Sequence, residues 1–137
     1  MGLWIQILPG SGDPIYIQIV EQISEAIAKG ELGVADRLPA VRKLASELVI
    51  NPNTVARAYN CLEQVGLVIS KTGSGTFVSD PKLRSSDAAD MNLLGERMDT
   101  IITRGLNLGL KEQALIAMFK DRINRFANKS KSRKKKI

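Results

Sequence analysis

The chain contains no histidine and only one cysteine, Cys61. Histidine is the commonest metal ligand and the usual acid–base group near neutral pH, and a lone thiol can form neither an internal disulfide nor a cysteine cluster. These absences exclude a structural zinc site and Ser/His or Cys/His catalysis. A site built from carboxylates alone stays possible in principle, but no nucleophile–base pair is present. We therefore expect no cofactor, no metal and no enzymatic activity.

Long hydrophobic runs are absent as well. No segment approaches the roughly 18 apolar residues that a membrane span needs. The apolar residues 1–9 lack the positive charge and the cleavage site of a signal peptide. A single thiol without a partner is typical of a reducing compartment. The sequence thus predicts a cytoplasmic protein with no membrane partner, and 137 residues allow one small domain plus an appendage.

Positive charge is plentiful, but most of it lies at one end of the chain. Twenty Lys+Arg and fourteen Asp+Glu give a net charge of +6. Residues 1–81 carry a net −2 and residues 82–137 a net +8, and six cations fall in the last nine residues. The net charge alone is therefore no evidence for a nucleic-acid-binding surface. Residues 128–137 are predicted to form a basic disordered tail, which either contacts DNA non-specifically or is only solvated.

The first predicted elements are a short strand and a helix. Leu3, Ile5 and Ile7 stand at alternate positions, which is typical of a strand. Asp13-Pro14 then supplies a capping carboxylate and a first-turn proline, and Gly30 supplies a helix stop. Between them, isoleucines recur every four residues along one face of an amphipathic helix, at Ile15, Ile19, Ile23 and Ile27.

Two further helices and a hairpin are predicted next. Residues 39–48 have an apolar stripe at helical spacing, and Asn51-Pro52 begins a third helix that ends at Gly66. Two helices separated by about four residues predict a helix-turn-helix over about 41–60. Strand-type segments on either side of a glycine-containing turn then predict a hairpin over about 67–79. Residues 1–80 are therefore predicted to form a winged helix-turn-helix, a mainly α (α+β) fold.

The C-terminal part is predicted to be helical and to mediate dimerisation. Polar residues 81–90 predict a linker, and apolar periodicity in 91–127 predicts two helices, with Gly105–Gly109 as an interruption between them. Two such helices cannot bury both apolar faces alone. Docking on the winged helix is one solution, and pairing with a second copy is the other, which we predict. The expected dimerisation residues are Leu94, Met98, Ile101, Leu115, Phe119 and Ile123.

The candidate DNA-binding residues lie on the third helix, before it and in the hairpin. In a helix-turn-helix the first residues of the second helix meet base edges in the major groove. Asn pairs well with adenine and Arg with guanine, and glycines let a hairpin approach a DNA strand closely. Each candidate residue alone could be a surface or turn residue, but the order and spacing of the candidates favour DNA contact. The candidates are Arg42, Asn51, Asn53, Thr54, Arg57, Lys71, Gly73, Gly75 and Thr76.

Five segments resemble the N-terminal domain of GntR-family bacterial transcription regulators. They start at Pro14, Leu38, Asn53, Leu62 and Gly73 and are PIYIQI, LPAVRKLA, NTVARAY, LEQVGL and GSGTFV. The resemblance covers about 13–79, and the short C-terminal part resembles the YtrA subfamily. It implies DNA contact by Arg42, Asn53, Thr54 and the wing around Gly73. Many members have Ser where this chain has Ala40, and some have Arg in place of Pro52 or Ala56, which predicts a different base preference.

The resemblance implies a sequence-specific transcriptional regulator. We expect a repressor that binds a double-stranded operator with an inverted repeat as a C2 homodimer, because two-fold symmetry places two recognition helices at equivalent half-sites. The subfamily resemblance also implies control of a transporter operon, often of the ABC type. The alternative is a winged-helix module for protein–protein contact, which the net −2 of residues 1–81 keeps open. The sequence identifies neither the operator nor a small-molecule effector.

Overall fold

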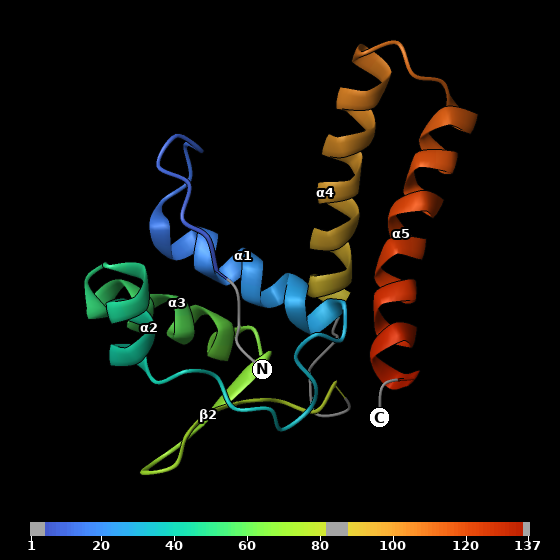
Figure 1. Ribbon diagram of the computed structural model, residues 1–137. Coiled ribbons are helices and arrows are strands. Elements are labelled where there is room, and N and C mark those ends of the chain that lie inside the picture. Colours follow the sequence, from blue (N-terminus) through green and yellow to red (C-terminus); the bar gives the residue numbers. More distant parts are fainter. Residues whose placement is uncertain (1–4, 82–87, 136–137) are drawn as a thin grey trace. The chain divides into compact units, whose positions relative to one another are not determined.

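The computed structural model describes residues 5–81 and 88–135, of which residue 89 and residues 128–135 are described by their backbone only. The chain divides into two compact units, Met1–Arg84 and Ser85–Ile137. The elements in chain order are α1 (Ile15–Ala28), α2 (Val41–Leu48), α3 (Pro52–Gln64), β1 (Val68–Lys71), β2 (Gly75–Val78), α4 (Ala88–Asn107) and α5 (Glu112–Lys135) (Figure 1). The fold is the predicted winged helix-turn-helix followed by a helical region. The predicted linker falls largely on residues 82–87, outside the described residues.

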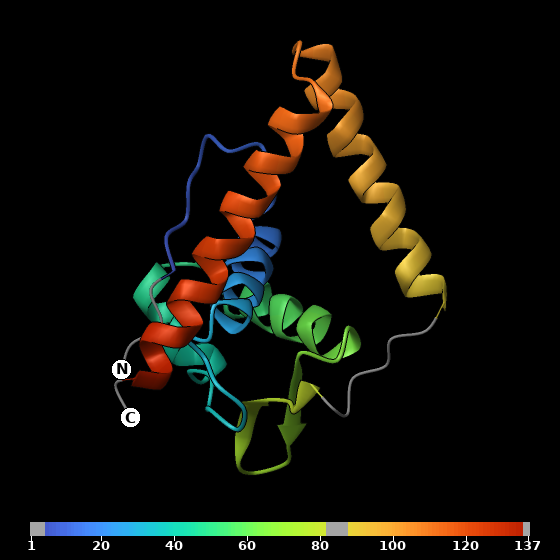
Figure 2. The same cartoon turned by 90° about the vertical axis from the view of Figure 1, so that its right-hand side faces the viewer.

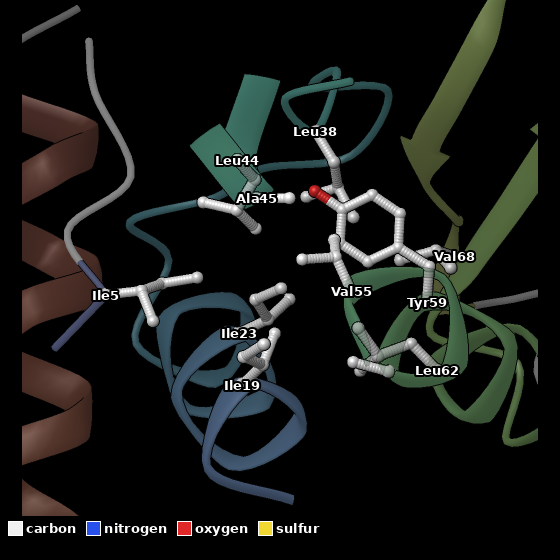
Figure 3. Close-up of a cluster of buried hydrophobic side chains, with 11 residues drawn as sticks. Ile5, Ile19, Ile23, Leu38, Leu44, Ala45, Val55, Tyr59, Leu62 and Val68 are labelled. Atoms are coloured by element: carbon white, nitrogen blue, oxygen red, sulfur yellow. The ribbon is translucent and has the colours of Figure 1, made fainter. Parts of the chain in front are cut away.

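One apolar core holds the first unit together (Figure 3). Ile19 and Ile23 are fully buried, as their four-residue spacing predicts, and they face side chains of α2 and α3. The α3 side chains that point inward repeat at helical spacing, and the buried cluster is Ile5, Ile19, Ile23, Leu38, Leu44, Ala45, Val55, Ala58, Tyr59, Leu62 and Val68. Because α3 buries this face, its opposite face is left exposed.

A hydrogen bond from the core fixes the start of α2. The Tyr59 hydroxyl donates to the Pro39 carbonyl over 2.7 Å. Burial raises the pKa of Tyr59, and the nearby Glu47 carboxylate raises it further, so the hydroxyl keeps the proton that it donates. This bond ties α3 to the residues that precede α2 and so helps to set the geometry of the helix-turn-helix.

The wing consists of two strands, and a short third segment pairs with it in a way that the sequence does not predict. β1 and β2 pair antiparallel, from Val68 opposite Val78 to Lys71 opposite Gly75. On the other side of β2, the Leu38 N–H donates to the Thr76 carbonyl over 2.8 Å, and an isolated bridge joins residues 37 and 77. The hairpin, light green in Figure 2, is therefore attached to the segment that leads into α2.

Residues 5–8 do not form the predicted strand, and residues 1–4 lie outside the described residues. Two glutamines of α1 take the place of a partner strand. The Gln22 amide accepts from Gln6 N–H and donates to Gln6 C=O, both over 2.9 Å. Gln18 makes the same pair with the backbone of Leu8, and also donates to the carbonyl of Asp13. The Asp13 carboxylate does not cap α1, whose N-cap position is the following proline.

In the second unit, α4 and α5 run in opposite directions and diverge from the turn that joins them (Figure 2). The predicted interruption at Gly105–Gly109 is wrong at its start, because α4 continues to Asn107, and correct at Gly109, which lies in the turn before α5. A Cβ added at Gly105 would lie 2.5 Å from Leu115 Cδ2, so the glycine permits a close approach of the two helices beside their turn. No helix in the described part of the chain has the length and hydropathy to cross a membrane.

The structure also differs from the predicted disordered tail. α5 continues to Lys135, so the backbone of residues 128–135 is helical, while residues 136–137 lie outside the described residues. Lysine and arginine are good helix formers, and no glycine or proline follows Gly109. Cations in the last turns of a helix also interact favourably with the helix dipole. These local preferences outweigh the charge repulsion on which the prediction of disorder depends.

A β-branched residue occupies the left-handed position in the turn between α2 and α3. Val49 has φ of 56° and is 87% exposed. This conformation costs a residue with a Cβ about 1–2 kcal/mol. Replacing Val49 with glycine, which loses more entropy on folding by about 0.5–1 kcal/mol, should therefore raise the free energy of unfolding by about 0.5–1 kcal/mol. Thermal unfolding followed by circular dichroism measures the change.

Val65 provides the matched control for this substitution. It is also exposed, at 65%, and also follows a helix, but its φ of −85° suits any residue. Val65→Gly should therefore lower the free energy of unfolding by about 0.5–1 kcal/mol. Equal destabilisation by Val49→Gly and Val65→Gly would contradict the assignment of strain to the turn.

Candidate nucleic-acid interface

The start of α3 is held by its own cap. The Asn51 side chain Oδ1 accepts from the Asn53 N–H over 2.8 Å, and Pro52 occupies the first helical position, as predicted. Such a cap satisfies one of the free N–H groups of the first turn and fixes the direction in which α3 begins. Because Val55 and Ala58 point into the core, Asn53 and Arg57 lie on the exposed side of α3.

A hollow of about 400 Å³ lies between the first turns of α1 and α3. Four of the predicted DNA-binding residues line it, together with two residues of α1; the lining consists of Ile15, Tyr16, Asn51, Asn53, Thr54 and Arg57. Among the lining residues that the structure describes, those of α3 and its cap are polar, one is a cation and none is a carboxylate. The lining therefore suits an anionic or hydrogen-bonding ligand.

Arg57 is held by an aromatic ring in this hollow. Its guanidinium carbon lies 3.8 Å from the centre of the Tyr16 ring, which is a cation–π contact. No carboxylate pairs with Arg57 among the residues that the structure describes. The guanidinium charge is therefore available to a ligand while the side chain is kept in one place.

The wing carries one cation, Lys71, and two glycines with positive φ. The Lys71 ammonium lies 5.3 Å from the centre of the Phe77 ring. Gly73 has φ of 78° and Gly75 has φ of 124°. A Cβ added at Gly75 would lie 2.8 Å from Arg37 Nε, so this glycine leaves room for the arginine to cross the hairpin. Lys71 of the wing and Arg37 of the segment that pairs with it thus both lie beside a glycine turn.

The structure gathers the predicted DNA-binding residues into two groups and leaves one apart. Asn51, Asn53, Thr54 and Arg57 share the hollow at the start of α3. The other group belongs to the wing and consists of Lys71, Gly73, Gly75 and the half-buried Thr76, whose carbonyl takes part in the pairing of the wing. Arg42 is exposed on the first turn of α2, outside the hollow.

Sequence reasoning missed two residues of this surface, Tyr16 and Arg37. Tyr16 stands in the first turn of α1, forty-one positions before the arginine that it contacts, and no local pattern connects the two. Arg37 lies in an irregular segment whose pairing with the wing is visible only in the structure. The signal available for both was their residue type, an aromatic or a cation beside a predicted helix start.

No group of three or more His, Cys, Asp and Glu side chains that could hold a metal ion occurs in residues 5–81 and 88–135, as far as their side chains are described. The described residues around the start of α3 offer hydrogen-bonding groups and one cation, Arg57.

Comparisons with known proteins agree on one family. The sequence model described as "Bacterial regulatory proteins, gntR family" matches residues 15–78. The HTH-type transcriptional repressor YtrA of Bacillus subtilis is 35% identical over 117 residues, which are 85% of this chain and 90% of that protein. The uncharacterized HTH-type transcriptional regulator YhcF of the same organism is 34% identical over 106 residues, 77% of this chain and 87% of that protein.

Solved structures show the same likeness. A protein from Listeria monocytogenes described as a transcriptional antiterminator has a TM-score of 0.81 and 28% identity, with 90% of this chain and 92% of that chain covered. YtrA from Sulfolobus acidocaldarius, described as a GntR-family transcription factor, has a TM-score of 0.56 and 39% identity, with 75% and 97% covered. Both likenesses extend over most of the chain.

Proposed function

Because the chain belongs to the GntR family of bacterial regulatory proteins and to its YtrA-like subfamily, we propose that it represses transcription by binding an inverted-repeat operator as a homodimer. At the coarser level, it is a DNA-binding transcription regulator and not an enzyme. The observation that carries the proposal is the group of polar residues at the exposed start of α3, opposite its buried face.

In the proposed complex, α3 enters the major groove with its first turn leading. Asn53 and Thr54 contact base edges there, because an Asn amide pairs with adenine and a Thr methyl packs against thymine. Arg42 donates to the phosphate backbone that flanks the groove. The wing approaches the neighbouring strand, where Lys71 supplies charge and Gly73 lets the backbone come close.

The second unit supports the dimer. Apolar side chains of both helices are left uncovered along their length, and Ile101 and Phe119 are 68% and 54% exposed. The other predicted dimerisation residues that are exposed are Leu94, Met98 and Ile123, while Leu115 is half-buried against Gly105. An uncovered apolar surface of this kind marks an interaction site in a soluble protein. The partner that we propose for this surface is a second copy of the same two helices, because a C2 interface pairs a surface with itself.

The proposed repression is supported by the similarity to the repressor YtrA, and occlusion of DNA is the mechanism that we propose for it. A dimer bound across two half-sites covers promoter DNA and keeps polymerase away from it. We place this action in the cytoplasm and, following the subfamily, on an operon that encodes a transporter. Mapping the sites that the protein occupies in its own cells identifies those target genes.

Selection of binding sites from a randomised duplex pool, with the full-length chain and competitor DNA, tests the proposal directly. The enriched sites should contain an inverted repeat whose half-sites are about 10 base pairs or a multiple of that apart, centre to centre. Affinity should fall by about 10³–10⁵ between 50 and 200 mM salt if about 6–10 phosphates are contacted. Enrichment of sites without two-fold symmetry would contradict the dimer, and no enrichment at low salt would favour a protein-contact module.

A further inference from the structure

The contact between Tyr16 and Arg57 joins two helices at the edge of the DNA-binding surface. Arg57 belongs to the exposed side of α3, whereas Tyr16 is half-buried against the core in the first turn of α1. The ring is therefore fixed by packing, and the arginine is exposed. With 3.8 Å between the guanidinium carbon and the ring centre, the packed ring supports the exposed side chain.

In this position, no ion pair with another described residue occupies the edge of the guanidinium. An arginine that stacks by its face keeps its N–H donors in the plane of the group, where they match two oxygens of a phosphate. Because the Arg57 guanidinium lies over the ring of Tyr16, a residue of α1, it is held at the side of α3. The hollow beside it is lined by Asn51, Asn53 and Thr54, and none of its described lining residues is a carboxylate that would compete for the charge.

Support by the ring also reduces a cost of binding. A free arginine side chain has many rotamers, and fixing it in a complex loses that freedom. The Tyr16 ring imposes the fixed position before DNA arrives. The benefit does not depend on which base pair lies nearby, because a backbone phosphate is present at every position.

We infer that Tyr16 is a positioning residue for DNA binding, which holds Arg57 so that the edge of its guanidinium donates to a phosphate of the operator backbone. The inference rests on the proposed function and deepens it. It assigns Arg57 to the backbone rather than to a guanine edge, and it leaves base contact to Asn53 and Thr54.

The test compares full-length variants on a duplex selected by the wild-type chain. Tyr16→Leu should weaken binding by at most about two- to fivefold for each protomer bound, because the gain from holding Arg57 in place cannot exceed the strength of the cation–π contact that holds it. The loss should be the same on operator and on random duplex DNA. Arg57→Ala should reduce the steepness of the salt dependence by about 1 for each protomer. Tyr16→Phe keeps the ring and should bind like the wild type.

A double-mutant cycle separates positioning from packing. If Tyr16 acts through Arg57, Tyr16→Leu should have no further effect on DNA affinity in the Arg57→Ala background. Should Tyr16→Leu unfold the chain, Arg57→Lys supplies the second measurement, because it keeps the charge but loses the planar stack. It should weaken binding without changing base preference, while thermal unfolding stays that of the wild type.

Three results would overturn the inference. Tyr16→Leu could bind as tightly as the wild type, the two substitutions could be additive, or Arg57→Lys could change the preferred base at one position, which would make Arg57 a base-contacting residue. Failure of the proposed function looks different, because the wild-type chain itself would then select no site.

Discussion

Alanine in place of Asn53 is expected to remove most of the discrimination between the operator and competing DNA. The residue lies exposed in the first turn of α3, whose start is fixed by the Asn51 cap. A good bidentate pair between an Asn amide and adenine contributes about 1–3 kcal/mol. The affinity for the selected operator should therefore fall about 5- to 150-fold at each half-site. Competition binding with operator and random duplexes measures the change.

The absence of charge on Asn53 makes this prediction specific to base contact. Asn53 is neutral, so its loss should leave the salt dependence and the affinity for random DNA unchanged. Asn107→Ala provides a matched control, because this asparagine is also exposed but ends α4. Unchanged operator preference in Asn53→Ala would show that base contact lies elsewhere on the surface.

The helix-turn-helix could be predicted from the sequence because its determinants are local. Isoleucines at four-residue spacing define the buried face of α1, and Asn51-Pro52 defines the start of α3. Each signal depends on neighbours within one or two turns, so no knowledge of the tertiary fold is needed. The same holds for the hairpin, whose glycine turn separates two short strand-type segments.

The details that the sequence did not predict depend on distant partners. Alternation in residues 3–7 indicates an extended chain, but a strand needs a partner, and Gln18 and Gln22 provide the hydrogen bonds instead. The contact of Arg57 with Tyr16 and the crossing of Gly75 by Arg37 likewise join segments far apart in the chain. Local patterns show which residues are polar or apolar, but not which of them meet.

Glycine is ambiguous for the same reason. Gly105 costs a helix interior about 1 kcal/mol relative to alanine, so from sequence alone it indicates a break. In the structure it is buried inside α4, where the absence of a side chain makes room for Leu115. Whether a glycine ends a helix or permits a close approach depends on what packs against it, which the residues around it do not specify.

A charge introduced at Ile101 is expected to break the proposed dimer and with it most operator binding. Ile101 is 68% exposed on the apolar side of α4. At a dimer interface, Ile101→Asp would bury a carboxylate twice without a partner, a change that costs several kcal/mol. Sedimentation at micromolar concentration should then give the monomer mass. Operator affinity should fall about 10²–10⁴-fold, because the second half-site is no longer bound by a linked protomer.

Thr100→Asp is the control that separates the interface from the helix. Thr100 precedes Ile101 and is also exposed, but it lines a polar hollow with Asp99, Thr103, Arg104 and Asn107 on another side of α4. Both variants add one carboxylate to the same turn, so they share any cost to helix stability. If the two dissociate alike, the loss reflects a weakened helix. If Ile101→Asp remains a dimer while binding its operator normally, the exposed face of α4 is not the interface, and the two recognition helices must be brought together by another part of the chain.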